Sequence, residues 1–156
     1  MIDLKKKPFF LDEEACQWVK KTLEGMSDEE KVGQLFCEIL WDRPGREPED
    51  LFEVIEPGGV MYRPFPGEKM HDFSERLQKK AKIPLLISCN LERGGSGGNG
   101  GLTNGTYVAS PMGCAATDDA QAAYDLAAVA CEEGGACGVN LSLIHISEPT
   151  RLRCIS

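Results

Sequence analysis

The chain has no excess of basic residues, no long apolar run and little histidine. Its 156 residues include 17 Lys and Arg against 25 Asp and Glu, a formal net charge of −8. Nucleic-acid binding needs clustered positive charge, so this balance argues against a nucleic-acid partner. No stretch approaches the ~20 apolar residues of a membrane-spanning helix. The basic run Lys5–Lys7 precedes Pro8 and a charged segment rather than the apolar core of a signal peptide. We therefore expect a cytoplasmic protein with no nucleic-acid or membrane partner.

The cysteines lack the spacing of a metal site. They contain no CxxC pair, and zinc sites need closely spaced ligands. Three of them lie in apolar runs, where a free cysteine behaves as a small hydrophobe. These three are Cys37, Cys89 and Cys137, and the others are Cys16, Cys114, Cys131 and Cys154. We expect reduced core cysteines, no metal and no cofactor.

The end of the chain stands apart from the rest. Residues 141–151 read LSLIHISEPTR, followed by LRCIS. The first of these strings resembles the in-frame translation of a common sequencing adapter, and such segments are excluded from fold reasoning. We expect residues 1–140 to be natural sequence and residues 141–156 to be a non-native tail. The alternative is a short native C-terminal tail.

Helix and strand patterns alternate through the remaining residues. Apolar side chains at three- and four-residue spacing predict helices over 12–26 and 68–81, with Trp18 on a buried stripe. Ser27 and Glu30 form the capping-box pattern that begins another helix. A short helix is expected at 49–56, and an alanine-rich one from Asp118 to Gly134–Gly135. Apolar runs predict strands at 35–40, 59–62, 83–89 and 137–140, the third covered on both faces. This order predicts an α/β fold with about four parallel strands.

A glycine-rich loop, Gly94–Gly105, follows the clearest strand. Residues 95–100 match the GxGxxG spacing of dinucleotide sites, but turn residues follow where a helix should begin. We therefore expect an adaptable loop next to a ligand site. An alternative is a small flavodoxin-like module that binds an anionic ligand with this loop.

Four motifs, in order, resemble glycoside hydrolase family 3. They are the segments Met26–Phe36, Pro57–Arg63, Ile83–Gly95 and Glu133–Asn140. The resemblance implies the first half of a (β/α)8 TIM barrel, left incomplete after about four strands. Family members are retaining exo-glycosidases, which include β-N-acetylhexosaminidases and β-glucosidases.

The resemblance also implies a sugar site after the third strand. Asn90 aligns with an aspartate that contacts sugar hydroxyls in many members. Asparagine can still donate and accept hydrogen bonds, but without the strength of a charge. Glu92 is a second candidate, although Arg93 separates it from the glycines and leaves the register of these two residues open. Arg63, at the end of the second strand, is a weaker candidate.

The resemblance implies that this chain holds no catalytic residue. Retaining hydrolysis needs a nucleophilic carboxylate and a general acid/base. In the family, both lie in later regions, so the chain alone is expected to be inactive. The full-length enzyme is expected to hydrolyse a β-linked sugar or oligosaccharide in carbohydrate metabolism, as a β-N-acetylhexosaminidase does. A β-glucosidase of the same family is the alternative. Trp41, at a strand end, is a candidate for stacking on the sugar.

Overall fold

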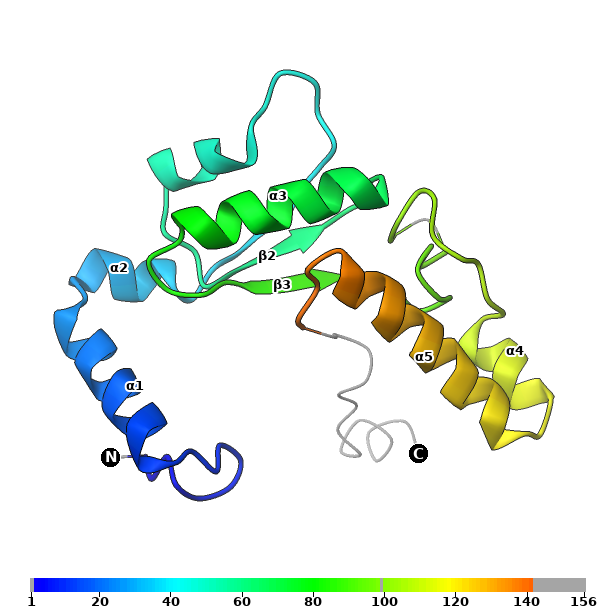
Figure 1. Cartoon of the computed structure of the whole chain (residues 1–156), viewed down its shortest axis with the longest axis horizontal. Helices are drawn as coiled ribbons and strands as arrows, with labels where there is room; N and C mark the ends of the chain where they lie inside the picture. The colour runs from blue at the N-terminus through cyan, green and yellow to red at the C-terminus, as the bar shows by residue number, and fades with distance from the viewer. Residues whose placement is uncertain (1, 99, 142–156) are drawn as a thin grey trace, which may run out of the picture.

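The computed structural model describes residues 2–98 and 100–141, which form an α/β fold (Figure 1). Three parallel strands make one sheet in the order β1-β2-β3: β1 (Cys37–Leu40), β2 (Gly59–Tyr62) and β3 (Leu86–Cys89). The helices are α1 (Glu13–Gly25), α2 (Asp28–Gly33), the 3-10 helix η1 (Pro48–Glu53), α3 (Gly67–Lys80), α4 (Pro111–Ala116) and α5 (Ala120–Ala136). The prediction of a parallel α/β fold is confirmed at this level.

The first helices begin where their capping residues predict. The Asp12 side chain accepts a hydrogen bond from the backbone N–H of Ala15 at 2.8 Å. Ser27 and Glu30 form a reciprocal capping box at the start of α2, with distances of 3.1 and 2.9 Å. Each arrangement satisfies N–H groups that a helix start leaves without partners.

The core lies between α3 and one face of the sheet. Figure 1 shows α3 running across β2 and β3. Buried residues from β2, β3, α3 and the segments next to them meet there: Val60, Tyr62, Phe65, Met70, Leu77, Leu85, Ile87 and Cys89. The Ser74 hydroxyl donates to the Tyr62 hydroxyl at 3.2 Å, so the buried phenol has a polar partner. Burial of one such apolar side chain stabilises a fold by roughly 1.5–3 kcal/mol.

The opposite face of the sheet is largely open. Ile39 and Leu86 are 46% and 53% exposed, and Cys37 is exposed beside them. The expectation that Cys37 is a core residue is therefore wrong. The third strand is covered on its second face at Ser88, which is fully buried, but not at Leu86. Successive side chains of a strand point to opposite faces, and α3 covers only one of them. Cys89 and Cys137 are buried, as predicted.

The apolar stripe of α1 is also open. Trp18 and Leu23 are 53% and 55% exposed, so the prediction that Trp18 lies in the core is wrong. Figure 1 shows α1 extending away from the sheet. Trp18 instead lines a cavity of about 360 Å³ together with Lys82 and Ile83. Periodicity identified the helix, but it could not show that the stripe stays uncovered by the described residues.

Residues 137–140 do not form the predicted fourth strand. The last helix, α5, continues through Gly134 and Gly135 to Ala136. The chain then meets β3 only in an isolated parallel bridge between Ser88 and Leu141. The backbone N–H groups of Asn140 and Leu141 donate to the Ile87 carbonyl at 2.9 and 3.0 Å. The Asn140 side chain adds to this contact, because its Oδ1 accepts from the Ile87 N–H at 2.7 Å and its Nδ2 donates to the Leu85 carbonyl at 3.0 Å. Three parallel strands are thus present among the described residues.

Other expectations meet the structure in different ways. Helix α4, with Ser110 as its N-cap, was not predicted. The expected non-native tail lies outside the described residues except for Leu141. None of the described helices has both the length and the apolarity needed to cross a bilayer. A flavodoxin-like sheet has the strand order 2-1-3-4-5, which differs from the sequential order here.

Candidate functional site

The two predicted sugar ligands lie at the carboxyl edge of the sheet. Asn90 and Glu92 follow β3, and both side chains are half-buried. Tyr62 is paired with Cys89 in the β2–β3 register, so the next residues, Arg63 and Asn90, are neighbours at the ends of their strands. The structure thus places Arg63, Asn90 and Glu92 at one edge. Ligands bind at this edge in parallel α/β folds.

The glycine-rich loop folds back over Asn90. Gly94, Gly97 and Gly98 have φ values of 74°, 55° and 60°, a region that favours glycine. A Cβ on Gly100 would lie 2.8 Å from the Cβ of Asn90, so the loop packs directly on this side chain. The loop is anchored beside α3 by a bridge between Leu102 and Phe65. Glycine is needed here because two backbone segments and a polar side chain occupy the same small space.

Glu133 on α5 holds the far end of the loop. Its carboxylate accepts hydrogen bonds from the Thr106 backbone N–H, at 2.8 Å, and from the Thr106 hydroxyl. A Cβ on Gly95 would come within 1.7 Å of Glu133 Oε2, so a larger residue there would displace the carboxylate from Thr106. The sequence contained no signal for this contact, because it joins residues 27 positions apart.

Arg93 turns away from the sheet edge. Its guanidinium donates to the Tyr107 hydroxyl and lies 5.7 Å from the centre of the Tyr107 ring. A Cβ on Gly98 would lie 2.8 Å from Arg93 Cδ, so the side chain also supports the loop. Arg93 therefore acts on the outer side of the loop in this structure.

The buried thiol and phenol behind the site are inert at neutral pH. Burial raises the pKa of Cys89 to about 11, against the smaller effect of a hydrogen bond to Asn90. Burial likewise raises the pKa of Tyr62 to about 12. A thiol is nucleophilic only as a thiolate, so Cys89 is a packing residue. Within residues 2–98 and 100–141, no cluster of His, Cys, Asp and Glu could hold a metal ion.

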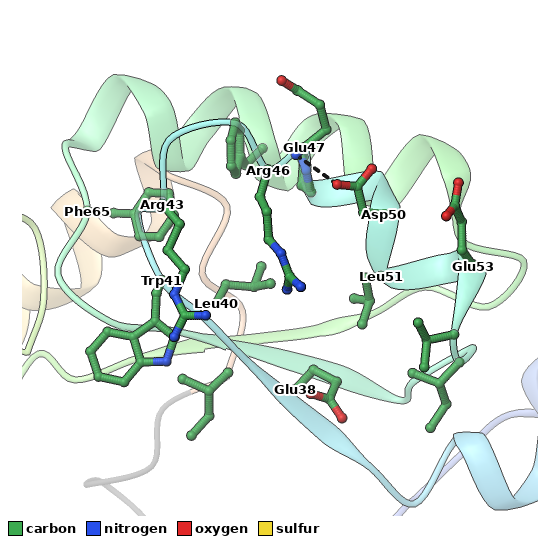
Figure 2. A pocket seen from close by; sticks show the side chains of 15 residues that line it. Glu38, Leu40, Trp41, Arg43, Arg46, Glu47, Asp50, Leu51, Glu53 and Phe65 are labelled. Carbon is green, nitrogen blue, oxygen red and sulfur yellow. Dashed lines mark hydrogen bonds between the residues drawn. The ribbon is translucent and has the colours of Figure 1, made fainter.

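A separate pocket lies beside β1. It has a volume of about 600 Å³, and neither Asn90 nor Glu92 lines it. Figure 2 shows the Arg43 and Arg46 side chains reaching from the loop after β1 toward Trp41 and Glu38. Trp41 is 51% exposed, so its indole is accessible. Large size alone does not identify this pocket as the sugar site, because β1 is the open edge of the sheet.

No family model matches the chain. Relatives are nevertheless clear in sequence and in structure. The chain is 38% identical over 140 residues to a beta-N-acetylglucosaminidase/beta-glucosidase of Cellulomonas fimi, which covers 90% of this chain and 24% of that protein. It also superposes on beta-glucoside phosphorylase BglX bound to 2FGlc with a TM-score of 0.85 and 59% identity, over 88% of this chain and 24% of that one. A second structure of beta-glucoside phosphorylase BglX gives 0.78 and 55%, over 88% and 23%.

The chain spans about a quarter of the length of these relatives. The match includes the strands, the glycine-rich loop and the residues at the sheet edge. Identities of 38–59% over so much of the chain indicate common descent rather than a shared fold alone. The resemblance to the N-terminal domain of glycoside hydrolase family 3 is therefore confirmed.

Proposed function

We propose that this chain forms the first part of an enzyme that cleaves β-glycosides, and that it supplies part of the sugar-binding site. The observation that carries the proposal is the grouping of Arg63, Asn90 and Glu92 at the carboxyl edge of a parallel sheet. The names of the relatives support this substrate class, since each refers to a β-glucoside or a β-N-acetylglucosaminide.

We propose that the Asn90 side chain forms hydrogen bonds with the sugar hydroxyls. Its side chain lies under the glycine-rich loop, and no hydrogen bond joins its amide to another described side chain. An amide can donate to one sugar hydroxyl and accept from the next. Glu92 is the second proposed ligand, as its carboxylate forms no ion pair among the described residues.

We infer that cleavage requires groups outside this chain. Retaining chemistry uses two catalytic groups on opposite sides of the scissile bond. Near Asn90 the described residues offer only Glu92 as a carboxylate at the sheet edge, and the chain covers 24% of its relatives. The chain therefore binds sugar without turning it over.

Two measurements on the purified chain test this function. In a heteronuclear NMR titration, methyl β-D-glucoside or methyl β-N-acetylglucosaminide is expected to shift the amides of residues 90–106. Asn90→Ala should abolish the shifts, whereas Gln121→Ala on the exposed face of α5 should preserve them. In the second measurement, the nitrophenyl β-glycosides of the same two sugars should not be cleaved. Turnover that co-purifies with the chain at constant specific activity, or sugar binding unchanged in Asn90→Ala, contradicts the proposal.

Phosphorolysis is a second candidate for the reaction of the complete enzyme. The two solved structures at 55–59% identity are both named beta-glucoside phosphorylase. The C. fimi relative, at 38%, is named for glycosidase activity. In the complete enzyme, release of a sugar 1-phosphate only when inorganic phosphate is present would separate phosphorolysis from hydrolysis.

A further inference from the structure

Two buried side-chain atoms among the described residues have no hydrogen-bond partner. They are Nε of Arg63 and Oγ of Ser96. Both residues belong to the same region, since Arg63 follows β2 and Ser96 lies in the loop after β3. Folded proteins rarely leave buried polar atoms without a partner, so two of them in one region indicate a place for a ligand.

The backbone fixes which way Arg63 leaves the sheet. Its N–H donates to the Leu40 carbonyl at 2.9 Å, so the residue continues the ladder between β1 and β2. Tyr62 points into the core beneath α3. Side chains alternate along a strand, so Arg63 leaves on the opposite face, next to Asn90. Arg63 therefore stands beside the proposed sugar ligand, away from the core.

The Arg63 guanidinium lacks a countercharge among the described residues. A guanidinium stays charged at every physiological pH, and no ion pair of the described residues includes Arg63. Its neighbour at the strand end, Asn90, is neutral. A half-buried charge without a partner is costly unless an ion of opposite sign binds it. A carboxylate at position 90 would supply that charge and would also repel an incoming anion.

We propose that Arg63 binds inorganic phosphate beside the sugar, with Ser96 Oγ as a second donor. The inference rests on the proposed function and identifies the co-substrate of the same site. The planar guanidinium fork matches two phosphate oxygens, and such charge-assisted bonds are among the strongest in proteins. Neutral Asn90 allows a dianion to approach the sugar subsite without repulsion from its nearest neighbour.

The first test uses the unmodified chain. Phenylglyoxal modification of individual arginines is followed by mass spectrometry, with and without inorganic phosphate. Phosphate is expected to slow modification of Arg63 and to leave exposed Arg46 unaffected. Equal rates at Arg63 with and without phosphate, or equal protection of Arg46, overturn the proposal.

The second test compares variants by isothermal titration with two probes, inorganic phosphate and methyl β-D-glucoside. Arg63→Met should weaken phosphate binding about tenfold or more, whereas Asn90→Ala should weaken glucoside binding more than phosphate binding. Arg46→Met is the matched control and should bind both probes like the wild type. If Arg63→Met retains the phosphate affinity of the wild type, the proposal for Arg63 is overturned, but the proposed sugar-binding function is not. A wild-type chain that binds neither probe overturns the proposed function as well.

Discussion

Glu133 is the residue through which α5 holds the loop that covers Asn90. Its carboxylate accepts both hydrogen bonds offered by Thr106. We predict that Glu133→Ala frees this end of the loop and speeds exchange of the Thr106 amide about tenfold, because a hydrogen bond to a charged acceptor is lost. Hydrogen exchange followed by NMR measures the effect. The adjacent, exposed Glu132→Ala is the control and should exchange like the wild type. Equal rates in both variants would show that the loop is held by other contacts.

For single residues, the sequence predicted the place in a strand or loop better than the burial of the side chain. Asn90 and Glu92 were expected after a strand, and they are found there. Cys89 was expected to be buried and is, but Cys37 in a similar apolar run is exposed. An apolar run shows that a strand forms; it does not show which face another element covers. The unpartnered Nε of Arg63 depends on neighbours distant in the chain, so no local pattern could reveal it.

The capping box of Ser27 and Glu30 stabilises the start of α2. Ser27→Ala should lower the free energy of unfolding by about 1 kcal/mol, because it removes the acceptor for the Glu30 N–H. Ser27→Thr keeps the hydroxyl and should restore most of the stability. Chemical denaturation measures both variants. A Ser27→Ala chain as stable as the wild type would mean that α2 does not take part in cooperative unfolding.

The same box makes α2 sensitive to acid. The pKa of Glu30 lies below its ordinary value of 4.5, mainly because Lys82 donates a hydrogen bond to its carboxylate and also because the Ser27 backbone N–H does. A carboxyl group whose pKa is lower in the folded state stabilises the fold at a pH above its pKa in the unfolded state. That stabilisation is lost as the pH falls through its pKa in the folded state. Part of the acid sensitivity below pH 4.5 should therefore disappear in Glu30→Gln.

Secondary-structure elements with local signals were predicted well, and those set by distant contacts were not. Helices α1 and α3 lie within one or two residues of their predicted bounds, because the periodicity of both helices and the Asp12 cap of α1 are local. The fourth strand is absent over residues 137–140 because α5 runs to Ala136 and the chain reaches β3 only at Asn140 and Leu141, whose backbone N–H groups both donate to the Ile87 carbonyl. Helix α4 is six residues long, too short to show a period.

At the scale of the whole molecule, the face of the sheet opposite α3 has exposed apolar side chains among the described residues. Ile39 and Leu86 are its large exposed side chains. Exposed apolar patches promote association, so the purified chain should self-associate, and Ile39→Lys should reduce this without loss of stability. Sedimentation velocity measures the association. The contrasting variant Val60→Thr, on the buried face, should destabilise the fold. A wild-type chain that stays monomeric at high concentration would contradict the expectation.

Asn140 and Leu141 make the two edges of the sheet different. The Asn140 side chain and the backbone N–H groups of both residues occupy the hydrogen-bonding groups of β3 at Leu85 and Ile87, while β1 keeps a free row of N–H and C=O groups among the described residues. Unbounded growth of strands from copy to copy needs two receptive margins, and a chain with one can only pair through it with a second copy about a twofold axis. The contacts of Asn140 and Leu141 with β3 thereby favour a closed pair of copies over a fibre.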